Sequence, residues 1–234
     1  MLIIIDARIP QEAKDFLGNI GEVFQLHSKN IVYDSIKGHP DIFLLQMEEL
    51  VIMAPNAPIK LKEIFKKHRI PFLWGKTKLG KEHPETVHYN AVCTKDFLIH
   101  KEGLTDSCIL HETEKKKFIP VSQAYTRCNL LSLSDGSFIT SDRGIDKRLT
   151  NEGLEVYYFN SDDVVLEGQE HGFLPGAMGV FNKSVYILGH LGFYSEGERL
   201  RQLMASKNMD IIELYKGPII DGGGIFFHES FESK

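Results

Sequence analysis

The chain has 234 residues, 42% of them hydrophobic, which is enough for a full core in one large domain or two small ones. Its net charge of -5 offers no basic surface for nucleic acid, so we do not expect a nucleic-acid partner. The three cysteines, Cys93, Cys108 and Cys128, are widely spaced and form no CxxC motif, which argues against a disulfide framework and a zinc knuckle.

The N-terminal run "MLIII" is interrupted by Asp6. It is too short for a signal peptide or a membrane span, and it predicts a buried strand. We therefore expect a cytoplasmic protein without a membrane segment. Pro10 then predicts the first turn of a helix, Gly21 predicts its end, and residues 22–26 predict a second strand.

Four later stretches share one pattern, which is an apolar run, a polar turn and a second apolar run. They are "PDIFLLQMEELVIMAP" from Pro40, "YNAVCTKDFLIHKEG" from Tyr89, "CNLLSLSDGSFITSDRG" from Cys128 and "GAMGVFNKSVYILGHLG" from Gly176. Each stretch predicts a β-hairpin, and the regular spacing of their starts indicates a repeated supersecondary unit.

A helix and a further strand are predicted after three of the four hairpins. These segments are "IKLKEIFKKHRIPFLWG", "IDKRLTNEGLEVYYFN" and "SEGERLRQLMASKNMDIIELY". The second unit differs, because its segment "LTDSCILHETEKKKFIP" carries a charge run that is typical of a solvated face or loop.

The two ends of the chain complement each other. Residues 1–27 contain the later part of the unit without its first strand, and "GGGIFFHE" near the C-terminus supplies one. We predict that the last strand pairs with the first, which completes a fifth unit and closes a ring without open sheet edges. The simpler alternative is a plain α/β sheet with an irregular order of elements.

A ring of five ββαβ-type units closed by its own termini resembles the pentein fold. This is the five-bladed, pseudo-symmetric α/β propeller of arginine deiminase, agmatine deiminase, dimethylargininase, the amidinotransferases and the ribosome anti-association factor. Three segments carry the resemblance, namely "HPDIFLLQMEELVI", "FITSDRG" and "DGGGIFFHE". The resemblance implies a single pentein-like domain over residues 1–234, with units starting near residues 40, 89, 128, 176 and 222, the last completed by residues 1–27.

The sequence departs from the family at the three groups that its enzymes use. In those enzymes a cysteine thiolate attacks the guanidinium carbon, a histidine transfers protons and carboxylates hold the guanidinium. Phe226 and Phe227 stand where agmatine deiminases have His-Cys, and Pro175 stands nearest to the histidine of the fourth unit. Leu45 and Gln46 occupy the expected positions of the acids, and Glu48 and Glu49 come close to them only if the turn is shifted. We therefore do not expect guanidine hydrolysis by the family's route.

The Ser-x-Arg segment of the family is retained as Ser141 and Arg143. In the family this arginine binds the carboxylate of an amino-acid-like substrate, so the resemblance implies a small-molecule ligand with a carboxylate. The alternative is a surface arginine that pairs with Asp142 or Asp146.

Polar residues at the unit starts are the other candidates, because the first strands of a pentein surround its channel. The candidate ligand-binding residues are His39, Asp41, Asn129 and Glu167, together with Ser141 and Arg143, and the candidate catalytic residues are Cys128, His171 and Asp221. We expect the charge of Arg127 to lower the pKa of Cys128 and favour its thiolate. Asn129 and the other unit-start amides have the simpler interpretation of turn caps.

No cofactor and no metal are predicted. A set of Glu167, Glu170 and His171 lacks the helical register of a zinc-binding motif, and the glycine triplet is not followed by the helix of a dinucleotide-binding loop.

Three functions remain open from the sequence. The first is a protein that binds a small amino-acid-like or anionic ligand in the channel. The second is an amidinotransferase-like or hydrolase-like enzyme with a repositioned pair of Cys128 and His171. The third is a non-enzymatic interaction protein like the anti-association factor. The oligomeric state is not predicted.

Overall fold

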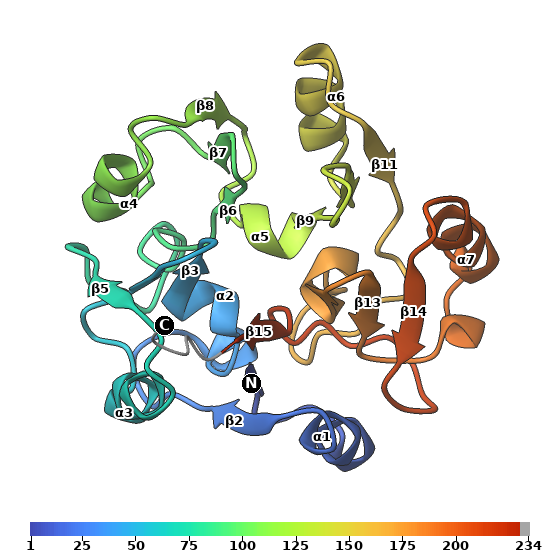
Figure 1. Ribbon diagram of the computed structural model, residues 1–234, viewed down its shortest axis with the longest axis horizontal. Coiled ribbons are helices and arrows are strands. Elements are labelled where there is room, and N and C mark those ends of the chain that lie inside the picture. The colour runs from blue at the N-terminus through green and yellow to red at the C-terminus, as the bar shows by residue number, and fades with distance from the viewer. Residues whose placement is uncertain (230–234) are drawn as a thin grey trace.

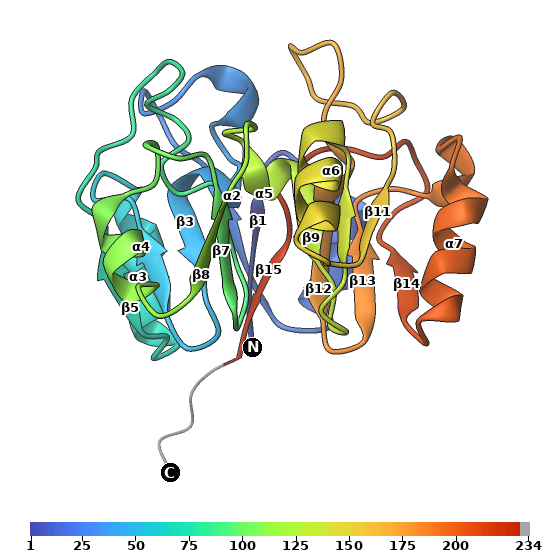
Figure 2. The same cartoon turned by 90° about the horizontal axis from the view of Figure 1, so that it is seen from above.

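The computed structural model describes residues 1–229 and contains five three-stranded sheets arranged around a central axis (Figure 1). In every sheet the middle strand pairs antiparallel with a first strand and parallel with a third. The helix that joins the middle and third strands lies at the outside of the ring (Figures 1 and 2). The predicted fold of five ββαβ-type units is therefore confirmed.

The elements follow the chain in five groups. The first comprises α2 (Pro40–Phe43), β3 (Leu44–Gln46), β4 (Val51–Met53), α3 (Ile59–Lys67) and β5 (Phe72–Trp74). The second comprises β6 (Val92–Cys93), β7 (Phe97–His100), α4 (Ser107–Glu112) and β8 (Lys117–Pro120). The third comprises α5 (Thr126–Asn129), β9 (Leu130–Ser132), β10 (Phe138–Thr140), α6 (Arg143–Asn151) and β11 (Val156–Tyr158).

The fourth comprises η2 (Leu174–Ala177), β12 (Met178–Phe181), β13 (Ser184–Ile187), η3 (Leu191–Phe193), α7 (Gly197–Ser206) and β14 (Asp210–Glu213). The fifth combines both ends of the chain, and comprises β15 (Phe226–His228), β1 (Leu2–Asp6), α1 (Gln11–Gly18) and β2 (Glu22–Leu26), followed by η1 (Asp34–Ile36).

The two terminal strands close the ring as predicted. β15 pairs antiparallel with β1, with Leu2 opposite His228 and Ile4 opposite Phe226. The first strands of the sheets contact one another in the order β3, β6, β9, β12 and β15. The side-chain amide of Gln46 on β3 donates to the backbone carbonyl of Phe227 on β15 at 2.8 Å. This bond connects the first strand of the fifth unit to the first strand of the first unit.

The core lies between the sheets, and β1 shows why its strands are continuously apolar. All five of its residues are buried. Alternate side chains of a strand point to opposite faces, so Ile3 and Ile5 pack in one hydrophobic cluster while Leu2 and Ile4 pack in another. A strand covered on both faces has no polar side to present.

The second unit contains the same helix and strand as the others, and the charge run between them lies in an exposed turn, as expected. Residues 107–112 form α4 and residues 117–120 form β8. Asp106 caps the helix, since its carboxylate accepts a hydrogen bond from the backbone N–H of Cys108 at 2.8 Å.

The glycine triplet before β15 allows the backbone to pass close to the channel side chains. Gly223 has a φ of +68°, and a Cβ atom at this position would lie 2.3 Å from the Cβ of His39. Only glycine fits both the left-handed backbone and this close approach.

None of the helices within residues 1–229 is long and apolar enough to cross a lipid bilayer.

Candidate functional site

Polar side chains from several units meet at the centre of the ring. His39 and Asp41 lie at the start of α2, Cys128 lies on α5, and Asp221 lies in the segment before β15. All four side chains are buried. They come together because each precedes the first strand of its unit, and these strands contact one another around the axis.

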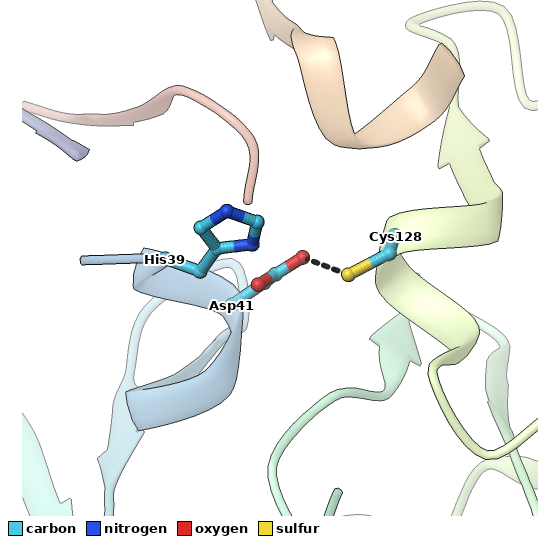
Figure 3. Close-up of side chains that lie close together, drawn as sticks. All are labelled: His39, Asp41 and Cys128. Atoms are coloured by element: carbon cyan, nitrogen blue, oxygen red, sulfur yellow. Dashed lines mark hydrogen bonds between the residues drawn. The ribbon is translucent and has the colours of Figure 1, made fainter. Parts of the chain in front are cut away.

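Cys128 contacts Asp41 across the channel (Figure 3). Its thiol donates to Oδ2 of Asp41 at 2.9 Å. Burial raises the pKa of Asp41 to about 6, and burial together with the charges of Asp41 and Asp221 raises the pKa of Cys128 well above its usual value. The expectation that Arg127 makes this cysteine a ready thiolate is therefore wrong, because loss of solvent and nearby carboxylates dominate.

Asn90 holds this contact in place from the second unit. Its Oδ1 accepts from the backbone N–H groups of Arg127 at 2.8 Å and Cys128 at 3.3 Å. Its Nδ2 donates to the backbone carbonyl of Asp41 at 3.2 Å and lies 3.4 Å from the sulfur of Cys128. The amide thus links three units, which is the structural role expected for a buried side chain with all its groups paired.

His39 lies between two carboxylates. Its Nε2 is 3.9 Å from Oδ2 of Asp6, and its Nδ1 is 3.9 Å from Oδ1 of Asp221. The residue is only 1% exposed, and neither ring nitrogen has a hydrogen-bond partner. Unpaired buried polar atoms are uncommon, so this imidazole is a candidate for contact with a ligand or an ion.

Both carboxylates beside His39 are fixed by other contacts. Asp6 forms a salt bridge with Arg8 at 2.5 Å, and Arg8 also donates to the carbonyl of Ser35 at 2.8 Å. Asp221 accepts from the backbone N–H groups of Phe173 at 2.9 Å and Gly223 at 3.0 Å. The channel centre is therefore preorganised and carries more acidic than basic groups.

Two adjoining cavities lie beside this centre. The deeper one, of about 250 Å³, is lined by the buried Asp6 and Asp221 together with Arg8 and Glu167. The other, of about 470 Å³, is lined by Arg8, Glu167 and Lys37 among others. Arg8 and Glu167 line both, so the two cavities adjoin. A larger cavity of about 570 Å³ lies away from this centre, between β8 and α6.

Arg127 lies near the centre of the ring, beside residues of the first strands. Its guanidinium donates to the backbone carbonyls of Pro175 and Met178, both at 3.0 Å, and lies 5.4 Å from the ring of Phe226. Burial lowers its pKa. A cavity of about 260 Å³ adjoins it, lined also by Gln46 and Glu48.

Arg143, the expected carboxylate hook, lines none of the cavities described above. It is exposed at the first position of α6 on the outside of the ring, and its guanidinium stacks 3.5 Å from the ring centre of Tyr158 (Figure 1). Ser141 precedes this helix, and its hydroxyl has no partner. The Ser-x-Arg pattern here begins an outer helix.

The predicted pair of Cys128 and His171 is not formed either. His171 is exposed in the loop before η2, and its Nδ1 lies 2.8 Å from the carbonyl of Gly172. Glu167 and Glu170 in the same loop are also exposed, and of these three only Glu167 lines the site. Asn129 donates to the backbone carbonyl of Tyr125 at 3.0 Å, as a turn-capping residue does.

The sequence interpretation missed Asp6 and Arg8 as site residues. The only signal was the charged pair that interrupts the apolar run at the end of the first strand. Carboxylates and arginines at strand ends are frequent in loops, so the signal becomes meaningful only once the ring places this strand end beside residue 221.

The residues that the resemblance places at the catalytic positions of guanidino-modifying enzymes are hydrophobic or make structural contacts in this chain. Phe226 and Phe227 are buried on β15, and Gln46 is used to connect β3 to β15. Pro175 contributes only its carbonyl, to Arg127.

Comparisons with known proteins agree with this fold. Among solved structures, a dimethylarginine dimethylaminohydrolase (DDAH) from Pseudomonas aeruginosa in complex with citrulline aligns with a TM-score of 0.55 and 10% identity, covering 91% of both chains. The amidinotransferase SxtG from Microseira wollei aligns at 0.57 with 8% identity, covering 91% of this chain and 87% of that one. The agmatine deiminase of C. jejuni aligns at 0.54 with 9% identity, covering 86% and 72%.

No match was found among curated proteins. The sequence matches the family of unknown function DUF6873 over residues 4–226. With most of its length inside that match and its five units aligned on guanidino-modifying enzymes, the chain belongs to the DUF6873 family and has the fold of the pentein superfamily.

Proposed function

We propose that the protein binds a small amino-acid-like molecule in the adjoining cavities beside the channel centre, with a cationic group of the ligand in the deeper cavity. The observation that carries this proposal is the charge of that cavity, which has Asp6, Glu167 and Asp221 against one arginine. Carboxylates bind ammonium and guanidinium groups through charge-assisted hydrogen bonds, and burial strengthens these bonds.

The outer cavity suits the other end of such a ligand. Lys37 lines it, with its ammonium 3.1 Å from the exposed carboxylate of Asp34. A ligand carboxylate can replace that solvent-exposed partner at little cost, since exposed ion pairs contribute less than about 1 kcal/mol. This assigns the predicted carboxylate contact to Lys37 in place of Arg143. The complex of the similar DDAH with citrulline, an amino acid, supports the ligand class.

The geometry favours binding over chemistry at Cys128. The thiol is buried, its pKa is raised, and it lines none of the cavities described above. A role as an interaction protein has weaker support, because the large exposed hydrophobic residues of the described chain are dispersed over separate elements. These residues are Phe16, Ile59, Leu73, Leu110, Val165 and Phe193.

Thermal unfolding in the presence of candidate ligands tests the proposal. A ligand that binds only the folded state at 100 times its dissociation constant stabilises it by about 2.7 kcal/mol. We expect arginine, ornithine or a related basic amino acid to raise the melting temperature. Agmatine, which lacks the carboxylate, and succinate, which lacks the cation, should raise it less at equal concentration.

Two exposed residues of one loop provide a matched pair of variants. Glu167→Gln should weaken binding of the basic amino acid by about tenfold, because it removes one carboxylate from the cavity. Glu170→Gln should leave it unchanged, since Glu170 lines neither cavity. If no basic amino acid stabilises the protein, or if both variants bind as the wild type does, the proposal is wrong.

A further inference from the structure

A second kind of site lies at the channel centre, and it does not depend on the proposed ligand. One potential ligand atom each of His39, Asp41 and Cys128 lies within 4.8 Å of the other two, and all three residues are buried (Figure 3). Among residues 1–229 this is the one such group of three or more. The geometry points to a binding site for a divalent transition-metal ion, with zinc the best match, and we propose that these three side chains are its protein ligands.

Unpaired atoms at the site are the first argument. Both ring nitrogens of His39 and Oδ1 of Asp41 are buried without a hydrogen-bond partner. A buried polar atom without a partner costs roughly 1–3 kcal/mol. A bound cation removes the cost at two of them, because an imidazole nitrogen and a carboxylate oxygen each offer it a lone pair.

The charge around the site is the second argument. Asp41 and Asp221 are both buried near Cys128, while Asp6 is neutralised by Arg8. The half-buried Arg127 is the cation that interacts with Asp41, Cys128 and Asp221. Two carboxylates against one guanidinium leave a net negative charge, which a divalent cation with one thiolate balances.

The surroundings of His39 are the third argument. A histidine that binds a metal usually donates its other N–H to a carboxylate, which fixes the ring and raises its basicity. Nδ1 is the ring nitrogen on the side of Asp41 and Cys128 (Figure 3), and Nε2 stands 3.9 Å from Asp6, so Nδ1 can bind the ion while Nε2 faces a carboxylate. Asn90, with its Nδ2 3.4 Å from the sulfur, can donate to a thiolate.

The donor set determines the kind of metal. Sulfur and imidazole nitrogen select zinc and similar transition metals, whereas magnesium and calcium prefer oxygen ligands alone. Three protein ligands leave the fourth position of a tetrahedral zinc site for water or an external ligand. Binding forms the metal–sulfur bond and releases the thiol proton to solvent, so affinity should rise with pH.

Cobalt(II) provides a direct readout, because it occupies zinc sites and a cobalt–thiolate bond absorbs in the near ultraviolet. Protein without a polyhistidine tag, freed of metal by a chelator, should bind one Co²⁺ per chain with this charge-transfer band, and Zn²⁺ should displace it. Cys128→Ser should abolish the band, while Cys93→Ser and Cys108→Ser, the matched controls, should retain it. His39→Gln should weaken binding by more than the roughly 10- to 100-fold that loss of an outer-shell partner costs.

Wild-type protein provides a second measurement that does not depend on the folding of any variant. Saturating Zn²⁺ should slow the alkylation of Cys128 by about tenfold or more, because a thiolate bound to the metal is not free to attack the reagent, and it should leave the rates at Cys93 and Cys108 unchanged. Absence of stoichiometric cobalt binding, a band that survives in folded Cys128→Ser, or equal alkylation rates with and without Zn²⁺ would each overturn the proposal.

Discussion

His100 is a buried histidine held in its neutral form, and it should make the protein sensitive to acid. Its Nδ1 lies 2.8 Å from the hydroxyl of Thr105 and its Nε2 lies 3.1 Å from the carbonyl of Ala124. Burial lowers the pKa of this side chain from 6.5 to about 4. Between these values the unfolded chain binds a proton that the folded chain does not.

The contribution of His100 to the free energy of unfolding is therefore complete above pH 6.5 and is lost as the pH falls toward 4. The loss should reach about 3 kcal/mol at pH 4 and below, since each pKa unit corresponds to about 1.4 kcal/mol. Urea unfolding at several pH values measures this slope. His100→Gln should flatten it, and His111→Gln, a change at an exposed histidine, should not. An unchanged slope in His100→Gln contradicts the assignment.

At the same scale, the sequence predicted correctly that some candidate residues lie at the axis of the ring, and it predicted the same for others that lie elsewhere. His39, Asp41 and Asp221 were found because they precede first strands, and the ring brings all first strands to one axis. Arg143 was misplaced because a short motif does not fix the direction of a side chain. It starts an outer helix, where stacking on Tyr158 is available. The pKa of Cys128 could not be predicted, because burial depends on the packing of all five units.

At the scale of elements, Asp106 organises the unit that the sequence described least well. Besides capping α4, its carboxylate accepts from the backbone N–H groups of Lys76 at 2.9 Å and Thr77 at 2.6 Å, and from the hydroxyl of Tyr89 at 3.2 Å. The residue is 1% exposed, so water cannot replace these bonds. One side chain thus fixes both the start of a helix and a neighbouring loop.

Asp106→Ala should therefore lower the free energy of unfolding by about 3 kcal/mol or more, because it leaves several buried donors without an acceptor. The matched control is Asp142→Ala. Asp142 caps α6 through one bond to the N–H of Ile145, and its loss should cost only about 1 kcal/mol. Chemical denaturation of both variants measures the difference. Equal losses would show that the additional bonds of Asp106 contribute nothing.

The elements also show where periodicity is informative. α3 was predicted because Leu61, Ile64 and Phe65 are at helical spacing, and in the structure Leu61 and Phe65 are buried. α4 was not predicted, since it has six residues and one buried side chain, Ile109, which is too short a pattern to stand out from the charged segment beside it. In such a segment only the capping aspartate marks the helix.

At the scale of the whole molecule, closure of the ring was the inference that sequence supported best. No single strand is long enough to establish it, because β15 has only three residues. The incomplete units at the two ends were recognisable because the unit is repeated. The N-terminal segment lacks a first strand, and the C-terminal segment contains an additional strand that can supply it. What the repeat could not show is which side chains meet at the axis, since each unit contributes different residue types.

Closure predicts that the chain can be permuted. Leu2 lies opposite His228, so a short glycine-serine linker can join Glu229 to Met1 without moving either strand. New termini between Glu102 and Gly103, in the exposed loop after β7, interrupt no strand or helix. This permutant should fold with native far-ultraviolet circular dichroism and one cooperative unfolding transition. A permutant opened between Ile3 and Ile4 should not fold in this way, because the cut lies inside β1. β1 is the middle strand of its sheet, and all of its residues are buried. If the first permutant fails to fold while its parent chain folds normally, the prediction is wrong. Folding then requires the chain to begin at β1 and to end at β15.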